Sequence, residues 1–417
     1  MAAIDGDGRG RQAIWDLVGP LTLSIAASHG FGFFLFPALL PATRAEVGLT
    51  YTSAAYITAA AQAAYMVGSV AAMTLGPRIG AGRLMLGTTC LTAACLFALA
   101  GADSAPTIGI LIATLAASAA LNWTSIAALS GHHVPVNRRA LALAVVSSGT
   151  AWGVSINGVS VSFVVPAWGV AGAWTLAGGL ALATAALAGL VLARRGALGP
   201  PTATPTVVSP DTEGTPEPAP SSAWRAALWW LRKPAVFYAC LFSALIGLSA
   251  MPYSTYLGAY LQGEVGHPAT LAGAVWSLIG FSGVAAGLGV GWFATRYGVR
   301  ASLCTSFLLF FAGALILVLS PHPPVVFAAS VFYGIMYFTF WGLIAAYVTR
   351  AFTPETSMRV IGASLICFGT VGALANWAGG LWAASGGSFA VLYGVVAGLA
   401  LIMALLAFGM PRREAAR

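Results

Sequence analysis

The sequence predicts an all-α polytopic membrane protein that crosses the bilayer twelve times, as two six-helix bundles related by a parallel repeat. Three observations support this fold class. Of the 417 residues, 59% are hydrophobic and only 7% are charged, whereas soluble domains carry about 25% charged residues. The basic residues form clusters separated by apolar stretches of about 40 residues or more, each long enough for two crossings. Short motifs also recur between the two halves at a nearly constant offset.

The positions of the basic residues orient the chain. Of nineteen Lys and Arg residues, only Arg44 falls in a segment that this topology places outside the cell. Because positive charge is retained in the cytoplasm during insertion, we expect a multi-pass protein of the cell inner (plasma) membrane with both termini cytoplasmic. The net charge of +8 follows from this asymmetry, so it does not indicate nucleic-acid binding.

The apolar stretches define the individual spans and the domain organisation. The predicted spans are 14–40, 52–75, 84–101, 106–131, 139–163 and 168–193 in the first half, and 235–261, 269–294, 301–320, 324–348, 359–384 and 386–410 in the second. They give a cytoplasmic N-terminus (1–13), a first bundle (14–193), a linker (194–234), a second bundle (235–410) and a cytoplasmic C-terminus (411–417).

The linker has a composition of its own. Seven prolines within 196–222 make a packed core implausible, so we expect that stretch to be disordered. Tryptophans and leucines mixed with Arg225, Arg232 and Lys233 follow it. This mixture suits a short helix on the inner membrane surface, or equally an extension of the seventh span.

The halves on either side of the linker repeat each other. Adding 218 to the residue number converts Glu46-Val47-Gly48 into Glu264-Val265-Gly266, Arg78 into Arg296, Gly80 into Gly298 and Trp123 into Trp341. A constant offset over a loop, a helix end and a helix middle indicates duplication. Six spans per half place both halves in the same orientation, with a solute site expected near the midplane between them.

The loops after the second and eighth spans resemble a known family. They read Pro77-Arg78-Ile-Gly80-Ala-Gly-Arg83 and Gly291-Trp-Phe-Ala-Thr295-Arg296-Tyr-Gly298-Val-Arg300. Together with the two sets of six spans, they resemble the major facilitator superfamily over essentially the whole chain, although Pro77 and Thr295 replace the usual Asp of its loop motif. Two further motifs, Phe31–Pro41 and Arg138–Gly149, resemble bacterial YbfB-like and monocarboxylate-type carriers.

The resemblance implies that contacts between the halves open and close alternately. The arginines of the two loops can cap helix ends and hold the cytoplasmic face closed. Small residues in the fifth span allow close helix approach. The expected gating residues are therefore Arg78, Arg83, Gly149, Gly153, Arg296 and Arg300.

Ionisable residues are nearly absent from the predicted spans. No Lys, Arg, Asp or Glu lies deep in a span, and such residues ordinarily mark ion and proton pathways. The pattern favours a neutral, weakly charged or amphipathic organic solute. His29, near the middle of the first span, is the exception. Its unperturbed pKa of about 6.5 makes it a candidate for proton coupling or for hydrogen bonding to the solute; the competing interpretation is a neutral histidine bonded to a neighbouring helix.

Aromatic and amide side chains at mid-span positions are the other candidates, because small-molecule sites combine aromatic walls with a few placed polar groups. Tyr333, Tyr337 and Trp341 recur at intervals of four and share one helix face. Tyr256 follows Pro252, which we expect to bend or break the seventh span. The predicted binding residues are His29, Asn122, Trp123, Tyr256, Tyr333, Tyr337, Trp341 and Asn376, with Gln62 and Tyr65 as further polar candidates. Ordinary helix packing is the alternative for each aromatic.

These features predict a secondary active transporter that moves a small neutral or monocarboxylate solute by alternating access, with a proton as candidate coupling ion. An exporter of amphipathic compounds is the alternative within transport, and a membrane receptor without transport is the alternative from another class. No buried catalytic pair and no Gly-x-x-x-x-Gly-Lys-Ser/Thr loop is visible, so we expect neither an enzyme nor an ATP-driven pump. We expect no cofactor or metal site, contact with membrane lipid, and a monomer.

Overall fold

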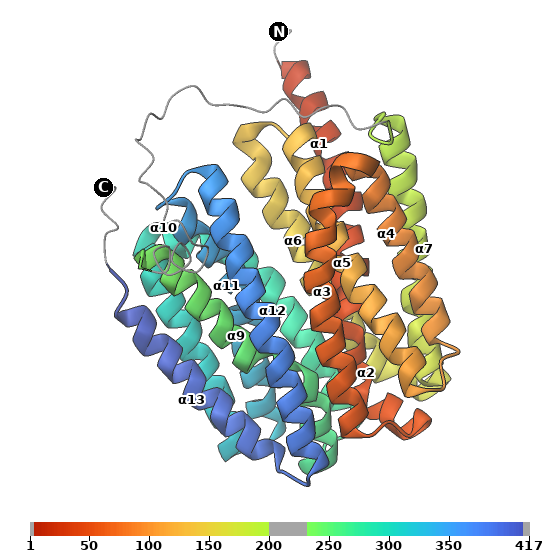
Figure 1. Ribbon diagram of the computed structural model, residues 1–417, viewed down its shortest axis with the longest axis vertical. Coiled ribbons are helices and arrows are strands. Elements are labelled where there is room, and N and C mark those ends of the chain that lie inside the picture. The colour runs from red at the N-terminus through yellow and green to blue at the C-terminus, as the bar shows by residue number, and fades with distance from the viewer. Residues whose placement is uncertain (1–3, 200–231, 412–417) are drawn as a thin grey trace, which may run out of the picture.

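The computed structural model describes residues 4–199 and 232–411. Within these ranges all regular structure is helical, and the helices form two bundles lying side by side (Figure 1). The first bundle contains α1 (Ile4–Ile25), η1 (Ala26–Phe31), α2 (Gly32–Val47), α3 (Tyr51–Ile79), α4 (Ala81–Leu99), α5 (Ala105–His133), α6 (Val136–Val159), η2 (Ser160–Val164) and α7 (Val165–Arg194). The second contains α9 (Pro234–Ala259), η3 (Tyr260–Glu264), α10 (Ala269–Leu319), α11 (Pro323–Thr349), α12 (Pro354–Ala384) and α13 (Phe389–Phe408). The proline-rich part of the linker and the surface helix expected near Trp224 lie outside the described residues.

The described helices are long and apolar enough for a multi-pass membrane protein. Ten stretches meet both criteria, and one of them, Leu141–Arg194, holds α6 and α7 together. The 29 residues of α3 also suffice to cross a core about 30 Å thick, although α3 is not among the ten. Each predicted span coincides with a helical segment, so the all-α membrane fold is confirmed, while the number of twelve crossings stays a prediction.

Two helices, α7 and α10, contain a break at a glycine, Gly169 in α7 and Gly298 in α10. At 51 residues, α10 would be about 75 Å long if straight, far more than one crossing needs. It breaks at Gly298, whose φ of 86° is a conformation that costs glycine little. Two spans therefore lie within α10. Of the bend or break expected at Pro252, the break is absent, because α9 runs from Pro234 to Ala259 and widens into the π-helical turn η3 only at Tyr260.

Backbone geometry confirms the repeat. The glycines with positive φ include Gly48 (72°) and Gly266 (82°), and also Gly80 (90°) and Gly298 (86°). Both pairs are separated by the offset of 218 found in the sequence. The two bundles therefore turn at matching places, and the same side of each bundle carries the same loops.

We name the two sides of the bundles by their connections. The linker side is where α7 ends at Arg194 and α9 begins at Pro234, and it also holds the N-terminal end of α1 (Figure 1, top). The loop side is the opposite side, where α2 ends at Val47 and η3 ends at Glu264.

On the loop side, a glutamate caps the last helix of each bundle. Glu46 accepts hydrogen bonds from the backbone N–H of Val170 at 3.0 and 3.3 Å. Its counterpart Glu264 accepts from the backbone N–H groups of Phe389 and Ala390. A carboxylate at a helix N-terminus satisfies free N–H groups and complements the helix dipole. The repeated glutamate of the sequence thus joins the end of the first span to the start of the last.

On the linker side, an arginine bonds the far end of the same two helices. Arg83 Nε donates to the carbonyl oxygen of Leu198, just after α7, at 2.8 Å. Arg300 donates to the carbonyl oxygen of Phe408, the last residue of α13. Each bundle therefore fixes its last helix at both ends with charged side chains of its own.

Replacing Glu264 with alanine is expected to lower the free energy of unfolding by about 1–2 kcal/mol, because partly exposed charge-assisted hydrogen bonds to a helix N-terminus are lost. Glu46→Ala should cost a similar amount, and the two effects should add because the sites are independent. Denaturant or thermal unfolding in detergent measures both. Asp103→Ala, which removes an exposed acid from another loop, is the control, and a loss no larger than the control's would contradict the prediction.

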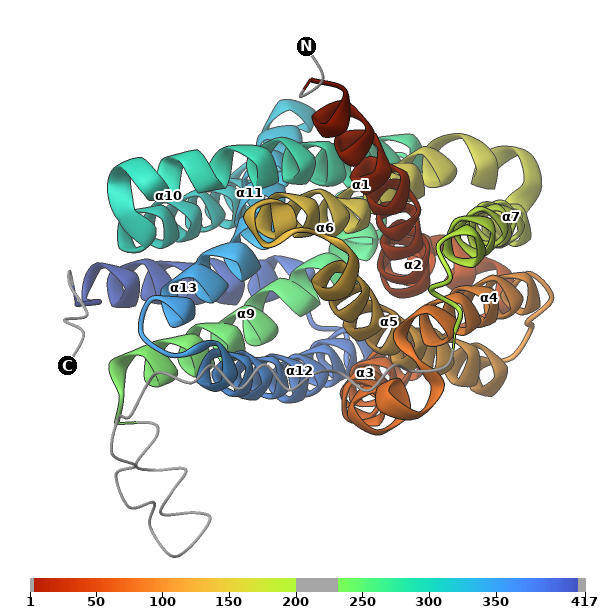
Figure 2. The same ribbon diagram turned by 90° about the horizontal axis from the view of Figure 1, so that it is seen from above.

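Among the described residues, three helix pairs make the main contacts between the bundles. The chain brings α3 against α12, α6 with η2 against α10, and α2 against α9. Figure 2 shows the first two pairs side by side from above, with α7 and α13 at the outer flanks. The interface is therefore formed mainly by α2, α3, α6 and η2 of the first bundle and by α9, α10 and α12 of the second.

Candidate functional site

A pocket lies at the interface between the two bundles. Its lining comes from α2, α3 and α5 of the first bundle and from α9 and α12 of the second, and comprises Phe33, Phe34, Phe36, Pro37, Thr58, Ala61, Gln62, Ile112, Met251, Ser254, Thr255 and Asn376. The empty volume is about 360 Å³, part of which is open to the surroundings. Aromatic and aliphatic groups form most of this wall, and none of the lining residues is charged.

Two amide side chains in this pocket have unpaired polar atoms. Gln62 is 2% exposed and Asn376 is 3% exposed. The Nε2 atom of Gln62 and the Oδ1 atom of Asn376 have no hydrogen-bond partner. Leaving a buried donor or acceptor unpaired costs about 1–3 kcal/mol. These two atoms are therefore an unpaired donor and an unpaired acceptor within the wall between the bundles.

Two of the three hydroxyl groups of the pocket are already engaged. Thr58 Oγ1 donates to the carbonyl oxygen of Ala54 at 2.9 Å. Ser254 Oγ donates to the carbonyl oxygen of Ala250 at 3.0 Å. Both are bonds to the preceding helical turn, which serine and threonine commonly make. The third hydroxyl, that of Thr255, also lines the pocket.

On the loop side, the bundles are in direct contact beside α6. A Cβ atom added to Gly158 would overlap the backbone of Gly273 and Ser277 in α10. Ser277 Oγ donates to the carbonyl oxygen of Ser155 at 3.0 Å, and Ser162 Oγ donates to that of Thr270 at 3.1 Å. Small residues permit such close helix approach within a membrane. We call this contact the glycine–serine seam.

A second contact closes the loop side beside α3. A Cβ atom on Gly380 of α12 would overlap Ala55 of α3. The ring of Tyr51, at the start of α3, meets the ring of Phe389 edge-on at 5.5 Å, and Phe389 stacks on Tyr256. Aromatic pairs of this geometry stabilise an interface beyond the area they bury. The pocket is therefore sealed from the loop side.

Towards the linker side, this close packing is not continued along α10. Near mid-helix, Gly280 lies against the backbone of Ala151 and Ser155. Further along, Cβ atoms on Gly287, Gly289 and Gly291 would have no other atom within 4 Å. The linker-side part of α10 thus stands away from α6, and the structure represents an arrangement closed on the loop side.

Of the predicted binding residues, Asn376 lies in the pocket and Tyr256 lies beside it. Tyr256 is fully buried, and its hydroxyl donates to the backbone carbonyl oxygen of Asn376 at 2.7 Å. This bond fixes the backbone at Asn376. Tyr256 therefore supports the pocket without lining it.

His29 lies in the π-helical turn η1, close to the pocket wall. Its Nε2 atom is 3.2 Å from the Tyr65 hydroxyl and its Nδ1 atom is 3.3 Å from the Ser28 hydroxyl. Its ring also meets the ring of Trp123 at 6.2 Å. Tyr65 in turn contacts Phe33 of the pocket at 5.7 Å. The bonded histidine that the sequence allowed is therefore present, and a chain of contacts joins it to the pocket.

Asn122 belongs to a polar cluster inside the first bundle rather than to the pocket. Its side-chain nitrogen lies 3.0 Å from Ser24 Oγ, 3.1 Å from Thr88 Oγ1 and 3.0 Å from Thr89 Oγ1. Its side-chain oxygen accepts from Ser24 Oγ. With both ends of its amide bonded, Asn122 has a structural role that accounts for its burial.

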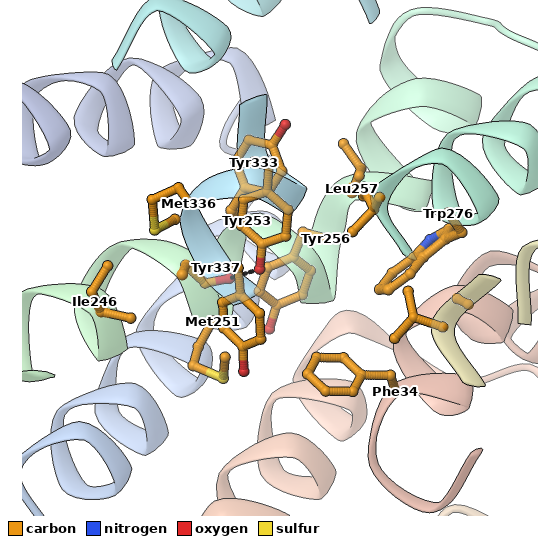
Figure 3. Close-up of a cluster of buried hydrophobic side chains, with 14 of the residues drawn as sticks. Phe34, Ile246, Met251, Tyr253, Tyr256, Leu257, Trp276, Tyr333, Met336 and Tyr337 are labelled. Atoms are coloured by element: carbon orange, nitrogen blue, oxygen red, sulfur yellow. Dashed lines mark hydrogen bonds between the residues drawn. The ribbon is translucent and has the colours of Figure 1, made fainter. Parts of the chain in front are cut away.

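The predicted face of α11 packs mainly within the second bundle. Tyr333 stacks on Tyr253 at 4.3 Å, and its hydroxyl donates to the carbonyl oxygen of Ala250 at 3.1 Å. Tyr337 reaches the interface, where its ring meets Phe34 of the first bundle at 5.8 Å. Figure 3 shows these tyrosines clustered near Met251 and Phe34. Trp341 lies further along, against Phe368 at 4.9 Å.

The two predicted gating glycines lie at helix contacts inside the first bundle. Cβ atoms added to Gly149 and Gly153 would meet the backbone of Thr22 and Gly30. Glycines that lie between the bundles include Gly158, Gly258, Gly273, Gly280, Gly369, Gly372 and Gly380.

Two of the four predicted gating arginines bond helix ends within their own bundle. These are Arg83 and Arg300. Arg78 and Arg296 are exposed on the linker side, and Arg296 interacts with the neighbouring Tyr297. The capping role expected of the arginines in the loops after the second and eighth spans is therefore played by Arg83 and Arg300, the second arginine of each loop.

The sequence points only weakly to four residues of the pocket wall. Gln62 is one polar mid-span residue among several, and Phe33, Phe34 and Phe36 belong to the apolar motif Phe31–Pro41. The available signal for a shared site was that two amide side chains, Gln62 on α3 and Asn376 on α12, lie at a similar depth in the membrane. Pairing them required knowing that α3 and α12 face each other.

Two similar bundles with a pocket shared between them define a two-bundle membrane transporter. The sequence model of the Major Facilitator Superfamily matches residues 22–300 and 281–417, so the chain belongs to that family. Its function is therefore membrane transport and not catalysis. No curated protein sequence matches the chain.

Solved structures share the fold over nearly the whole chain. A crystal structure of the nucleoside transporter NupG is 12% identical, covers 96% of this chain and 100% of its own, and has a TM-score of 0.67. A point mutant of NupG is 14% identical, covers 94% of this chain and 99% of its own, and has a TM-score of 0.66. At this identity the likeness concerns the fold alone.

Proposed function

We propose that the protein moves a small neutral organic solute across the plasma (inner) membrane by alternating access, with the bundles 14–193 and 235–410 as the moving units. The observation that carries this proposal is the uncharged pocket, lined by both bundles and holding two buried amides with unpaired atoms. A site built from both bundles changes its exposure when they rock against each other. The linker side is assigned to the cytoplasm by its basic residues, so the arrangement described here faces inward.

A monocarboxylate fits this pocket less well than a neutral solute. A carboxylate leaving water requires a cation or several hydrogen-bond donors. The pocket lining contains no Lys, Arg or His. The neutral member of the two expected solute classes is therefore preferred.

The test is binding followed by transport. The purified protein is heated with neutral, monoanionic and cationic solutes, including uridine because NupG is a nucleoside transporter, since ligands that bind the folded state raise the melting temperature. Solutes that stabilise it are then offered to proteoliposomes. Uptake of a neutral solute above protein-free vesicles supports the proposal. Stabilisation confined to bulky lipophilic cations would support an exporter instead, and binding without flux would indicate a receptor.

Proton coupling is assigned to His29 in this proposal, because it is a titratable group linked through Tyr65 to the pocket. His29→Gln is expected to keep solute binding but to abolish the dependence of uptake on pH between about 5.5 and 7.5, a range that brackets the ordinary pKa of histidine. His267→Gln, at a loop-side histidine bonded to the carbonyl of Pro321, should behave as wild type. Uptake by His29→Gln that still follows an imposed pH gradient would assign coupling elsewhere.

A further inference from the structure

We propose that Gln62 and Asn376 act as a pair that recognises an amide: a neutral solute whose edge carries a hydrogen-bond donor next to an acceptor, such as a carboxamide or a lactam. The inference rests on the proposed transport function and specifies its substrate class. It depends on three features of the pocket, namely the position of the two amides, the number of free polar atoms and the surrounding apolar wall.

The two amides face the same small volume from opposite bundles. Gln62 is on α3 and Asn376 is on α12, and these helices pack together. A Cβ atom added to Gly372 would lie 3.0 Å from Gln62 Nε2. Gly372 precedes Asn376 by four residues, which places both on one face of α12. Gln62 therefore reaches across to the helix turn next to Asn376, over a glycine that leaves room for it.

The free atoms complement an amide edge. Gln62 Nε2 is a donor and Asn376 Oδ1 is an acceptor, and neither has a partner. A carboxamide presents a C=O to the first and an N–H to the second. A carboxylate presents only acceptors, so its second oxygen would face Asn376 Oδ1 without a proton between them. An ester likewise lacks the N–H.

The apolar wall limits how many polar groups a solute can carry. Phe33, Phe34 and Met251 present surfaces without hydrogen-bonding groups, and the hydroxyls of Thr58 and Ser254 bond their own helices. A sugar or polyol would bury several hydroxyls with few partners, and each unpaired one is costly. A compact amide with an apolar body pairs with both free atoms and buries fewer polar groups.

The experiment compares benzamide with benzoate and methyl benzoate, which share the ring and differ in the recognised group. Binding to the full-length purified protein is measured by calorimetry and by thermal stabilisation. Benzamide is expected to bind about 10- to 100-fold more tightly than either analogue, since each lacks a donor that the site needs or carries a mismatched oxygen. Gln62→Met and Asn376→Leu should each remove most of this preference. Gln262→Met, at a glutamine of η3 that does not line the pocket, should preserve it.

Two results would overturn the inference. One is equal affinity for the three compounds with no change in Gln62→Met. The other is that benzamide does not bind even at about 10 mM, a concentration that would fill a site with a micromolar to millimolar dissociation constant. In both cases, uptake of another neutral solute into proteoliposomes would leave the proposed transport function standing. Thermal stability of the unliganded variants shows that each is folded.

Discussion

The substitution Gly158→Leu is expected to reduce transport about 100-fold while leaving the protein folded. Gly158 lies in the glycine–serine seam, where even a Cβ atom would overlap Gly273 and Ser277. Such overpacking costs about 3 kcal/mol, but only in the arrangement closed on the loop side. A cost of that size shifts the population of the two arrangements by about 100-fold, so the transporter would stay open on the loop side.

The measurement has two parts. Uptake into proteoliposomes gives the loss of transport, and labelling of Ser162→Cys by a membrane-impermeant maleimide, in a background without the native cysteines, reports opening of the seam. Gly394→Leu is the control, because that position in α13 is exposed with no atom within 4 Å of an added Cβ. Wild-type uptake by Gly158→Leu would show that this seam does not have to close during transport.

Removing the side chain of Tyr333 is expected to have the largest effect on stability. Tyr333 is 2% exposed and stacks on Tyr253 at 4.3 Å. Truncation of a buried aromatic to alanine costs about 3–5 kcal/mol. Tyr333→Phe removes only the bond to the Ala250 carbonyl and should cost about 1 kcal/mol. Unfolding in detergent measures both.

The control for Tyr333 is Tyr56→Ala, in which the removed side chain is 58% exposed and also lies in a membrane helix. It should lose less than about 1 kcal/mol, as exposed substitutions usually do. Solute affinity of folded Tyr333→Phe should match that of wild type. If Tyr333→Phe is stable but no longer binds solute, the Tyr333 hydroxyl takes part in solute binding as the sequence predicted.

The membrane fold was predictable because few physical constraints determine it. The thickness of the bilayer sets the length of a span, and the cost of burying charge sets where spans end. The sequence repeats Glu46 as Glu264, which indicates equivalent helix ends in the two halves. Both glutamates cap the last helix of their bundle. Proline was a weaker guide, because α9 continues without a break through Pro252 inside the helix.

The site was less predictable because hydropathy does not report which way a mid-span residue faces. Asn122 and Asn376 are each followed by tryptophan at similar depth, yet only Asn376 reaches the pocket. The difference lies in the neighbours, since Ser24, Thr88 and Thr89 supply hydroxyls to Asn122. Hydroxyl residues at matching depth on other helices were a signal that Asn122 is internally bonded. No such group bonds the side-chain oxygen of Asn376.

The uncharged pocket has an electrical consequence. A neutral solute crossing with the bundles carries no charge through the bilayer field, so the membrane potential neither drives nor opposes its passage. A proton carried on His29 would change this, because one elementary charge moved through 100 mV is worth about 2.3 kcal/mol, or about 50-fold in accumulation. Clamping vesicles at zero and at 100 mV therefore separates electrically silent exchange from cation-driven accumulation, independently of any pH measurement.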